Sequence, residues 1–315
     1  MTTAPAREGA TVIKKPKAVV RIGDRVFSAA SVISGSLILV VLVLVAAFLV
    51  WQSIPALTAK ASELPNNATN FWDYVGPLVF GTVWSALIAL VIAVPLSIGI
   101  ALFISHYAPR RLAPVLGYVI DLLAAVPSVV YGLWGIVVLA PFVKPFYAFL
   151  NEYLGWFPLF SGQVTGTGRT ILTASIVLAV MAIPIMTAVM REIFLQAPTL
   201  NEEAALALGA TRWEMIRLSV LPFAKSGIVS AIMLGLGRAL GETMAVALVL
   251  SVSTKVTFQV LTSLNPSTIA ANIALQFAEA SGTALNALVA SGLILFVITL
   301  VINMLARYIV RARVS

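Results

Sequence analysis

Long uncharged, apolar stretches recur along the chain and are separated by segments that carry most of the charged residues. A helix of about 20 apolar residues crosses the roughly 30 Å hydrocarbon core of a bilayer. Helices are expected because a membrane offers no water to exposed backbone groups, whereas a barrel would show short alternating runs. The pattern therefore predicts an all-α polytopic membrane protein with six transmembrane helices. The first stretch is centred on residues 33–51, and the other five lie within 77–105, 114–143, 170–190, 226–254 and 284–306.

The six predicted helices differ in how many helix-distorting residues they contain. Proline removes a backbone hydrogen bond and kinks a helix, and membrane helices tolerate it where neighbours satisfy the freed groups. The first and sixth helices have neither proline nor charge, so we expect helices two to five to form the core and the other two to lie outside it. The distorting residues are Pro95, Pro127 and Pro184 in helices two to four, and Gly235, Gly237 and Gly241 in helix five.

The composition agrees with this assignment and excludes several kinds of site. The 315 residues are 60% hydrophobic and 10% charged, with a mean hydropathy of +1.03, whereas a soluble domain is about 25% charged. Cysteine is absent, which excludes disulfides, thiolate metal sites and a cysteine nucleophile. His106 is the only histidine, which excludes a multi-histidine metal centre.

The net charge of +8 is distributed in the manner of a membrane protein rather than of a nucleic-acid-binding one. Fifteen of the twenty basic residues lie in the N-terminal tail, in 106–111, in 191–225 or at the C-terminus. The loops on the other side contain four. Basic residues accumulate in cytoplasmic loops, so we expect both termini to be cytoplasmic.

An aromatic segment, 146–160, follows the third predicted helix and contains few charges. Such a segment typically lies in the membrane interface. Docking of an external partner protein is the alternative.

The loop between helices four and five has the signals of two short helices. Thr199 precedes Glu202 by three residues, and Thr211 precedes Glu214 by three, so each pair forms a potential capping box. Gly209 lies between them and is suited to end the first helix with a positive φ angle. We expect a helix, a glycine turn and a second helix on the cytoplasmic face.

The same loop resembles the EAA loop of bacterial ABC importer permeases. In that family the loop forms the coupling helix that fits a groove on a separate ATPase, so the resemblance implies this role here. Ser219, where the family usually has isoleucine, is a departure. The matching residues are Glu203, Ala204, Ala205, Gly209, Leu221 and Pro222.

ATP hydrolysis is expected on a partner chain. The sequence has no G-x-x-x-x-G-K-[ST] phosphate-binding loop and no Gly-Lys dipeptide. We therefore expect no enzyme activity and no cofactor in this chain, with ATP and Mg²⁺ bound by the partner.

Arg238 and Glu242 stand in the middle of the fifth apolar stretch. A charge at the centre of a membrane helix costs roughly 2.5–3.5 kcal/mol on insertion scales, and residues four apart share one helical face. A neutralised ion pair that locks helix packing is one interpretation. The other is that Arg238 faces an anion path and that Glu242 holds it when no substrate is present. Asp121, in the third helix, either pairs with a basic loop residue or serves the same path.

Three further segments narrow the resemblance to phosphate-specific ABC transporter permeases of the PstC type. They are 122–135, 237–246 and 265–280. The resemblance implies the type I ABC importer permease fold, inorganic phosphate as substrate, and a path lined by Arg238 and Glu242. It also implies three partners, namely a PstA-type sister permease, a PstB-type ATPase dimer and an external PstS-type phosphate-binding protein, in the bacterial cytoplasmic membrane.

The domain organisation follows from the spans and the resemblance together. We expect a cytoplasmic tail over 1–27, the first transmembrane helix with an external loop over 28–75, the ABC transmembrane type-1 domain over 76–307 with its coupling loop at 197–222, and a cytoplasmic tail over 308–315.

Other functions remain as alternatives. A permease for sulfate or molybdate would share most of these features. An ion-coupled secondary transporter often shows two repeated halves, but only one EAA-like loop is present. A membrane-embedded enzyme would need a nucleophile with a base, or a metal cluster, and the predicted spans contain few ionisable groups.

Overall fold

The computed structural model describes residues 22–65, 68–251 and 253–312. The chain divides into two compact units, Met1–Phe48 and Leu49–Ser315. In the first unit the described residues form the N-terminal part of α1 (Ile22–Leu57), and none of them is buried. Most of the expected N-terminal tail, residues 1–21, lies outside the described residues.

The described part of the chain is helical, with one isolated bridge between Ser253 and Pro266. Six helical segments are long and apolar enough to cross a membrane, which agrees with the predicted number. The second unit contains the end of α1, α2 (Phe71–Leu102), α3 (Ala113–Ala124), α4 (Ser128–Trp134), α5 (Ala140–Leu154), α6 (Ile171–Leu195), α7 (Thr199–Ala207), α8 (Arg212–Met215), α9 (Leu221–Leu240), α10 (Met244–Val249), α11 (Ile269–Gln276) and α12 (Gly282–Ala312).

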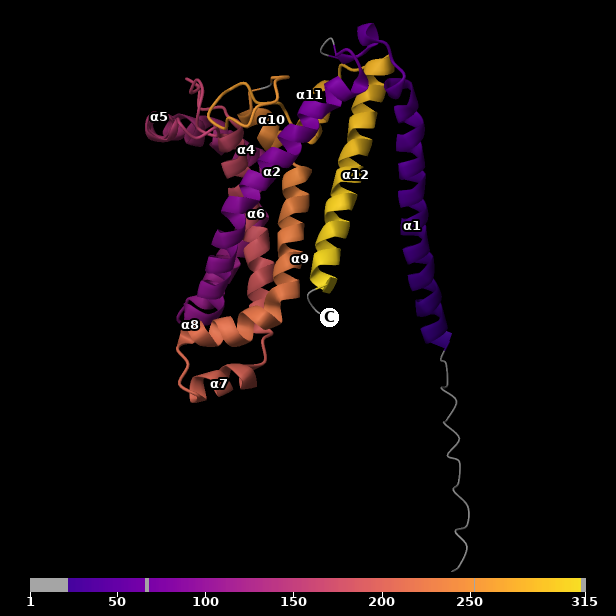
Figure 1. Ribbon diagram of the computed structural model, residues 1–315. Helices are drawn as coiled ribbons and strands as arrows, with labels where there is room; N and C mark the ends of the chain where they lie inside the picture. Colours follow the sequence, from indigo (N-terminus) through magenta and orange to yellow (C-terminus); the bar gives the residue numbers. More distant parts are fainter. Residues whose placement is uncertain (1–21, 66–67, 252, 313–315) are drawn as a thin grey trace, which may run out of the picture. The chain divides into compact units, whose positions relative to one another are not determined.

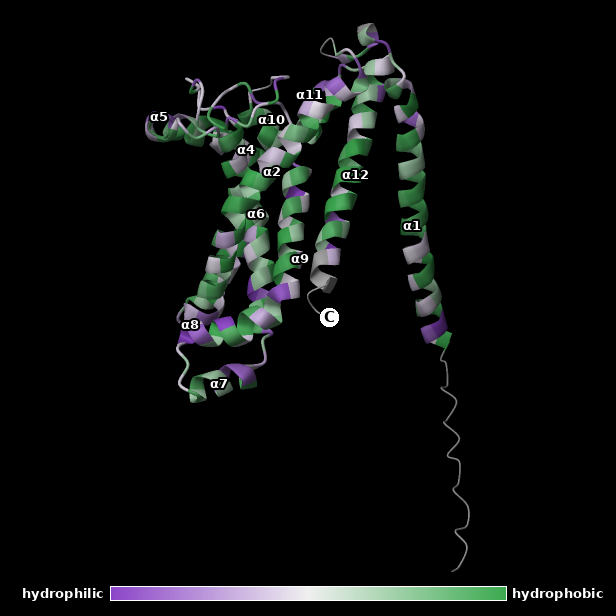
Figure 2. Ribbon diagram, viewed as in Figure 1, coloured by the Kyte–Doolittle hydropathy of each residue, from purple (hydrophilic) through white to green (hydrophobic). Residues whose placement is uncertain are grey.

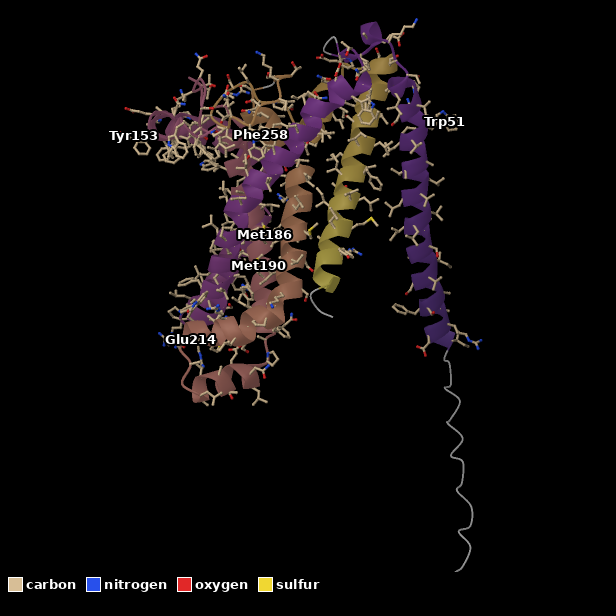
Figure 3. The ribbon with its side chains drawn as sticks, viewed as in Figure 1. Trp51, Tyr153, Met186, Met190, Glu214 and Phe258 are labelled. Atoms are coloured by element: carbon tan, nitrogen blue, oxygen red, sulfur yellow. The ribbon has the colours of Figure 1, made fainter. Side chains whose placement is uncertain are left out.

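Helix α6 is the centre of the second unit. It packs along α2 and α9, and 67% of its most apolar stretch is buried, against 17% for α12. Figure 3 shows Met186 and Met190 in the middle of the bundle, and both are fully buried. Helices α5, α10 and α11 lie at one end of this unit and α7 and α8 at the other, with apolar spans between two more polar ends (Figures 1 and 2).

The third predicted span is wrong as a single helix, because the chain is broken between α3 and α4. Pro127 has an extended ψ of 139° and precedes the first residue of α4. A proline cannot donate to the preceding turn, and it disfavours a helical conformation in the residue before it. The Tyr131 hydroxyl donates to the Leu123 carbonyl at 2.8 Å, which gives the end of α3 a polar partner inside the span. By contrast, α2 continues through Pro95 and α6 through Pro184.

The fifth predicted span is also interrupted. Helix α9 ends at Leu240, and Gly241 follows as its C-terminal cap with φ −92° and ψ 0°. The chain resumes as α10 at Met244. Arg238 therefore lies in the last turn of α9 and Glu242 in the break. The expectation that both charges share one face of a continuous helix is wrong.

Helix α5 lies across the end of the bundle rather than along it, and Tyr153 is near its C-terminal end (Figures 1 and 3). Four exposed aromatic residues recur on one face at spacings of four, three and four. This amphipathic arrangement is typical of a helix that lies in a membrane interface. The four are Phe142, Phe146, Phe149 and Tyr153.

Candidate functional site

The breaks in the third and fifth spans lie side by side, because α10 packs closely on α4. Two glycines allow this approach. A Cβ atom on Gly132 would come within 2.9 Å of the Ala245 Cα atom, and one on Gly135 would come within 2.8 Å of the Val249 side chain. Any larger residue at Gly132 would push α10 away, since the atom it meets is backbone.

Arg238 lies at this junction with an unsatisfied donor. Its Nε atom is buried and has no hydrogen-bond partner, although the residue as a whole is half-buried. Its guanidinium lies within electrostatic reach of the Tyr131 hydroxyl on α4. A buried donor without a partner is costly, and unsatisfied groups of this kind often mark sites whose partner is absent. The geometry at Arg238 suits a ligand with acceptor oxygens.

Glu242 is buried, with 8% of its surface exposed, and has a local structural role. Its Oε1 atom accepts a hydrogen bond from the Ala245 backbone N–H at 3.1 Å, in the first turn of α10. A carboxylate is favourable at a helix N-terminus, because it satisfies a free N–H group and complements the dipole. The ion pairs formed by the described residues are His106–Glu202 and Arg191–Glu192, so the expected contact between Arg238 and Glu242 is not made.

The other end of α10 is held by Arg169, which was not among the predicted site residues. Its guanidinium donates to the carbonyls of Leu248 at 3.2 Å, Val249 at 3.4 Å and Leu250 at 3.5 Å. The last carbonyls of a helix have no partner within it, and a cation there complements the dipole. Helix α10 is therefore fixed at each end by a charged side chain. The only sequence signal is a cation placed directly before Thr170, the cap of α6.

A polar hollow of about 520 Å³ lies next to the end of α10 that Arg169 holds. Ser251, two residues after the last residue of α10, contributes to its wall. The other hydroxyl-bearing residues that line it are Thr165, Thr167, Thr262 and Ser263. Hydroxyl groups both donate and accept hydrogen bonds, so this hollow is suited to a polar solute rather than to an apolar one.

Asp121 does not lie at this junction. It is exposed on α3 and lines a hollow of about 410 Å³ together with Arg191 and Glu192 of α6. The Arg191 guanidinium lies directly against Gly117, one turn before Asp121 on α3. Of the two roles expected for Asp121, this position favours the one beside a basic residue over the one on the anion path. Asp121 forms no ion pair within the described residues.

The hairpin formed by α7 and α8 agrees with the sequence prediction in two respects. Gly209 ends the turn with φ +88°, a conformation that favours glycine. Thr211 and Glu214 form the predicted capping box, in which each side chain bonds the other's backbone N–H. Figure 3 shows Glu214 at this end of the bundle.

The other predicted capping box, Thr199 with Glu202, is wrong. Pro198 takes the cap position with an extended ψ of 115°, so the helix begins at Thr199, one residue earlier than predicted. Thr199 is then the first helical residue and Glu202 the fourth. A capping box joins the cap residue to the third helical residue, and the carboxylate of Glu202 lies one position too far along.

The residues of the EAA-like pattern lie on this hairpin and at the start of α9. Glu203, Ala204 and Gly209 are exposed, and Ala205 is half-buried against the core. The described residues bring together no group of three or more His, Asp or Glu side chains suited to a metal ion.

Sequence comparisons with known proteins agree with these features. Residues 93–314 match the family model described as "Binding-protein-dependent transport system inner membrane component". The phosphate transport system permease protein PstC 2 of Mycobacterium tuberculosis (strain ATCC 25618 / H37Rv) is 43% identical over the full length of both chains. PstC of Mycobacterium leprae (strain TN) is 45% identical over 86% of this chain and 88% of its own. A chain of the MetNI methionine ABC transporter, solved in inward-facing conformations, covers 76% of this chain and 93% of its own, with 19% identity and a TM-score of 0.49.

The matched region covers α2 from residue 93 onward, the other four spans of the second unit and the α7–α8 hairpin. Both broken spans therefore lie within it. The resemblance inferred from the EAA-like loop is confirmed, and the chain is a membrane component of a transport system rather than its ATPase. It belongs to the binding-protein-dependent transport system inner membrane component family.

Proposed function

We propose that the chain is the permease subunit of an ATP-driven importer that moves inorganic phosphate across the bacterial cytoplasmic membrane. The substrate is supported by relatives named as phosphate transport system permeases, with 43% identity over the whole of both chains. The observation that carries the proposal is the buried, unpartnered Nε atom of Arg238 at the junction of two broken spans. A guanidinium offers a planar fork of donors that matches the oxygens of phosphate.

Broken helices at membrane depth are tolerated where they line a cavity or are covered by protein. Transporters use such breaks to bring polar groups to a substrate inside the membrane. In this proposal Arg238 binds the passing oxyanion weakly and releases it when the spans rearrange. Glu242, at the start of α10, repels a free anion and keeps the path closed between cycles. Weak binding is required, because a site that held phosphate tightly would not release it.

The α7–α8 hairpin is proposed to contact a separate ATPase. Its exposed Glu203 and Ala204 would meet the ATPase surface, and the turn at Gly209 would direct the chain back to the spans. Leu221 and Pro222 begin α9, the helix that carries Arg238, so motion at the hairpin has a direct route to the junction. Ala205 would hold the hairpin against the core.

The hairpin end of the bundle is proposed to face the cytoplasm, with both termini on that side. This end contains Arg110, Arg111, Arg191 and Arg212, and basic residues accumulate on the cytoplasmic side. We propose the domain boundaries stated above, with a transmembrane type-1 domain over 76–307. The proposed partners are a PstA-type sister permease, a PstB-type ATPase dimer that binds ATP and Mg²⁺, and a PstS-type phosphate-binding protein outside.

Reconstitution tests the proposal. The chain is placed in vesicles with the candidate sister permease and ATPase, and ATP hydrolysis is measured with the binding protein and phosphate, sulfate or molybdate. A complex whose ATPase lacks its phosphate-binding lysine is the control. We expect phosphate to stimulate hydrolysis and uptake together. Stimulation by sulfate or molybdate but not by phosphate would show that the substrate is another oxyanion. Uptake without ATP would show a secondary transporter.

A further inference from the structure

Helix α7 is attached to the rest of the protein by few contacts. None of its residues is buried, and it packs mainly on α8 and on the π-helical turn Ile216–Val220 that follows. The three residues 196–198 join it to α6, and 208–211 join it to α8. A helix held in this way transmits a displacement only through those connections and through any side chain that reaches the spans.

Besides the packing of Ala205 against the core, one polar side-chain contact of the described residues joins α7 to the end of a membrane-spanning helix. The His106 Nε2 atom lies 3.7 Å from the Glu202 Oε1 atom, within ion-pair range though longer than a hydrogen bond. The two side chains are only 10% and 20% exposed, so water screens this contact less than it screens a surface pair. Among the residues that the structure describes, it is the only ion pair between α7 and another helical element.

The local structure orients His106 toward Glu202. The Ser105 hydroxyl donates to the Ala101 carbonyl at 2.8 Å and lies 2.7 Å from the His106 Nδ1 atom. Because the hydroxyl proton is used by the carbonyl, the oxygen can accept from Nδ1. In the protonated imidazole both ring nitrogens carry a proton, so Nε2 then also donates toward the Glu202 carboxylate. His106 also lies in the π-helical turn Phe103–Tyr107 that continues α2, and π-turns are frequent at functional sites.

Two of the three glutamates of the hairpin, Glu202 and Glu214, differ in what they bond. Glu214 is used locally, because it caps α8 through Thr211. Glu202 lies one position too far along α7 for the equivalent cap, so its carboxylate is available to another element. The register of α7, fixed by Pro198, therefore directs Glu202 to α2.

We propose that His106 and Glu202 form the joint through which α7 moves α2. Helix α2 packs along α6, α9 and α12, so a displacement received at His106 reaches the helix that carries Arg238. His106 and Glu202 act as positioning residues, since neither touches the substrate. The inference rests on the proposal that α7 engages a partner ATPase.

The test uses the complete reconstituted transporter with its binding protein. The quantity measured is phosphate transported per ATP hydrolysed, in the wild type, in His106→Gln, in Glu202→Gln and in the double variant. We expect each single variant to lower this ratio about threefold or more, because mutations along a coupling route weaken the coupling between its two ends. The double variant should be no worse than the singles, because both changes remove one contact.

Two further variants distinguish loss of the His106–Glu202 contact from a general folding defect. His106→Lys retains a cation opposite Glu202 and should keep most of the coupling. Thr199→Ala changes a neighbouring position of α7 that makes no capping bond, and it should leave the ratio unchanged. The proposed joint is refuted if the phosphate transported per ATP is unchanged in the single variants. It is also refuted if the fold-loss of this ratio in the double variant equals the product of the fold-losses in the two single variants.

Co-purification of the ATPase distinguishes failure of the joint from failure of the proposed hairpin contact. His106→Gln and Glu202→Gln should retain the ATPase, whereas Ala204→Arg on the exposed face of α7 should release it. If Ala204→Arg keeps a full complement of ATPase, the hairpin contact itself is wrong. If the His106 and Glu202 variants lose the ATPase, the pair shapes the docking surface and the joint is refuted.

Discussion

The junction of the two broken spans and the α7–α8 hairpin both combine a glutamate with a cation, yet they leave their charges in different states. At the hairpin, Glu202 faces His106 and Glu214 caps α8. At the junction, Glu242 is occupied by the Ala245 N–H group, and the buried Nε atom of Arg238 has no partner. Glu202 and Glu214 of the hairpin therefore have partners within the chain, whereas the Nε atom of Arg238 at the junction has none among the described residues.

This difference separates a mechanical element from a binding site. A rigid hairpin transmits force best when its own contacts are satisfied, so its charges belong to the fold. A transport site has to offer a donor that is free when the substrate arrives. The charges of the two regions therefore predict different consequences when they are removed: loss of transport at the junction and small changes in stability at the hairpin caps.

The largest effect is expected at Arg238. Arg238→Ala should lower phosphate uptake by about a hundredfold, because a hydrogen bond to a charged group is worth about 1.5–3 kcal/mol and the site offers this cation to the anion. Uptake into vesicles is measured after confirming that the ATPase co-purifies. Arg238→Lys keeps the charge but not the planar fork of donors. Its phosphate uptake should lie between that of the wild type and that of Arg238→Ala. Wild-type uptake in Arg238→Ala would refute the path.

A smaller loss is expected when α10 is released at its far end. Arg169→Met removes three hydrogen bonds to the carbonyls of α10 while keeping an apolar stem. The junction should then lose its geometry, and uptake should fall about tenfold. In the Arg238→Ala background the same change should add little, since the two residues act on one site. A full, independent tenfold loss in that background would show that Arg169 acts elsewhere.

At the hairpin, removal of the formed capping box should change local stability but not the chemistry of transport. Thr211→Ala should cost about 1 kcal/mol, which corresponds to about fivefold faster amide hydrogen exchange in α8. Uptake should change by less than about twofold. Exchange as slow as in the wild type would show that the cap contributes nothing to α8.

The smallest effect is expected at the capping box that does not form. Thr199→Ala should leave both amide exchange in α7 and uptake unchanged, because Pro198 is the cap and Thr199 bonds no backbone N–H in its first turn. Accelerated exchange in α7, matching that of Thr211→Ala in α8, would contradict this assignment.

Features set by local sequence were predicted well. Apolar length alone predicts the number of spans, and the turn at Gly209 and the cap at Thr211 follow from nearest neighbours. The same Thr-x-x-Glu pattern at Thr199 failed because Pro198 takes the cap position, a one-residue shift that spacing alone does not reveal.

Features set by long-range packing were not predicted. The interruption of the fifth span depends on α10 docking against Gly132, more than a hundred residues earlier in the chain. The contact of Arg169 with Leu248 joins residues 79 apart, and that of His106 with Glu202 joins two different helices. Arg238 and Glu242 were identified from their cost in a membrane, but their separation was visible only in three dimensions.

The account is tested most directly by a structure of the assembled transporter trapped during turnover with arsenate, which has the shape of phosphate and is located by its anomalous X-ray scattering. We expect an oxyanion oxygen within about 2.7–2.9 Å of the Arg238 guanidinium, between the ends of α4 and α9. A guanidinium that is packed against a neighbouring span in every trapped state, with arsenate passing elsewhere, would contradict it.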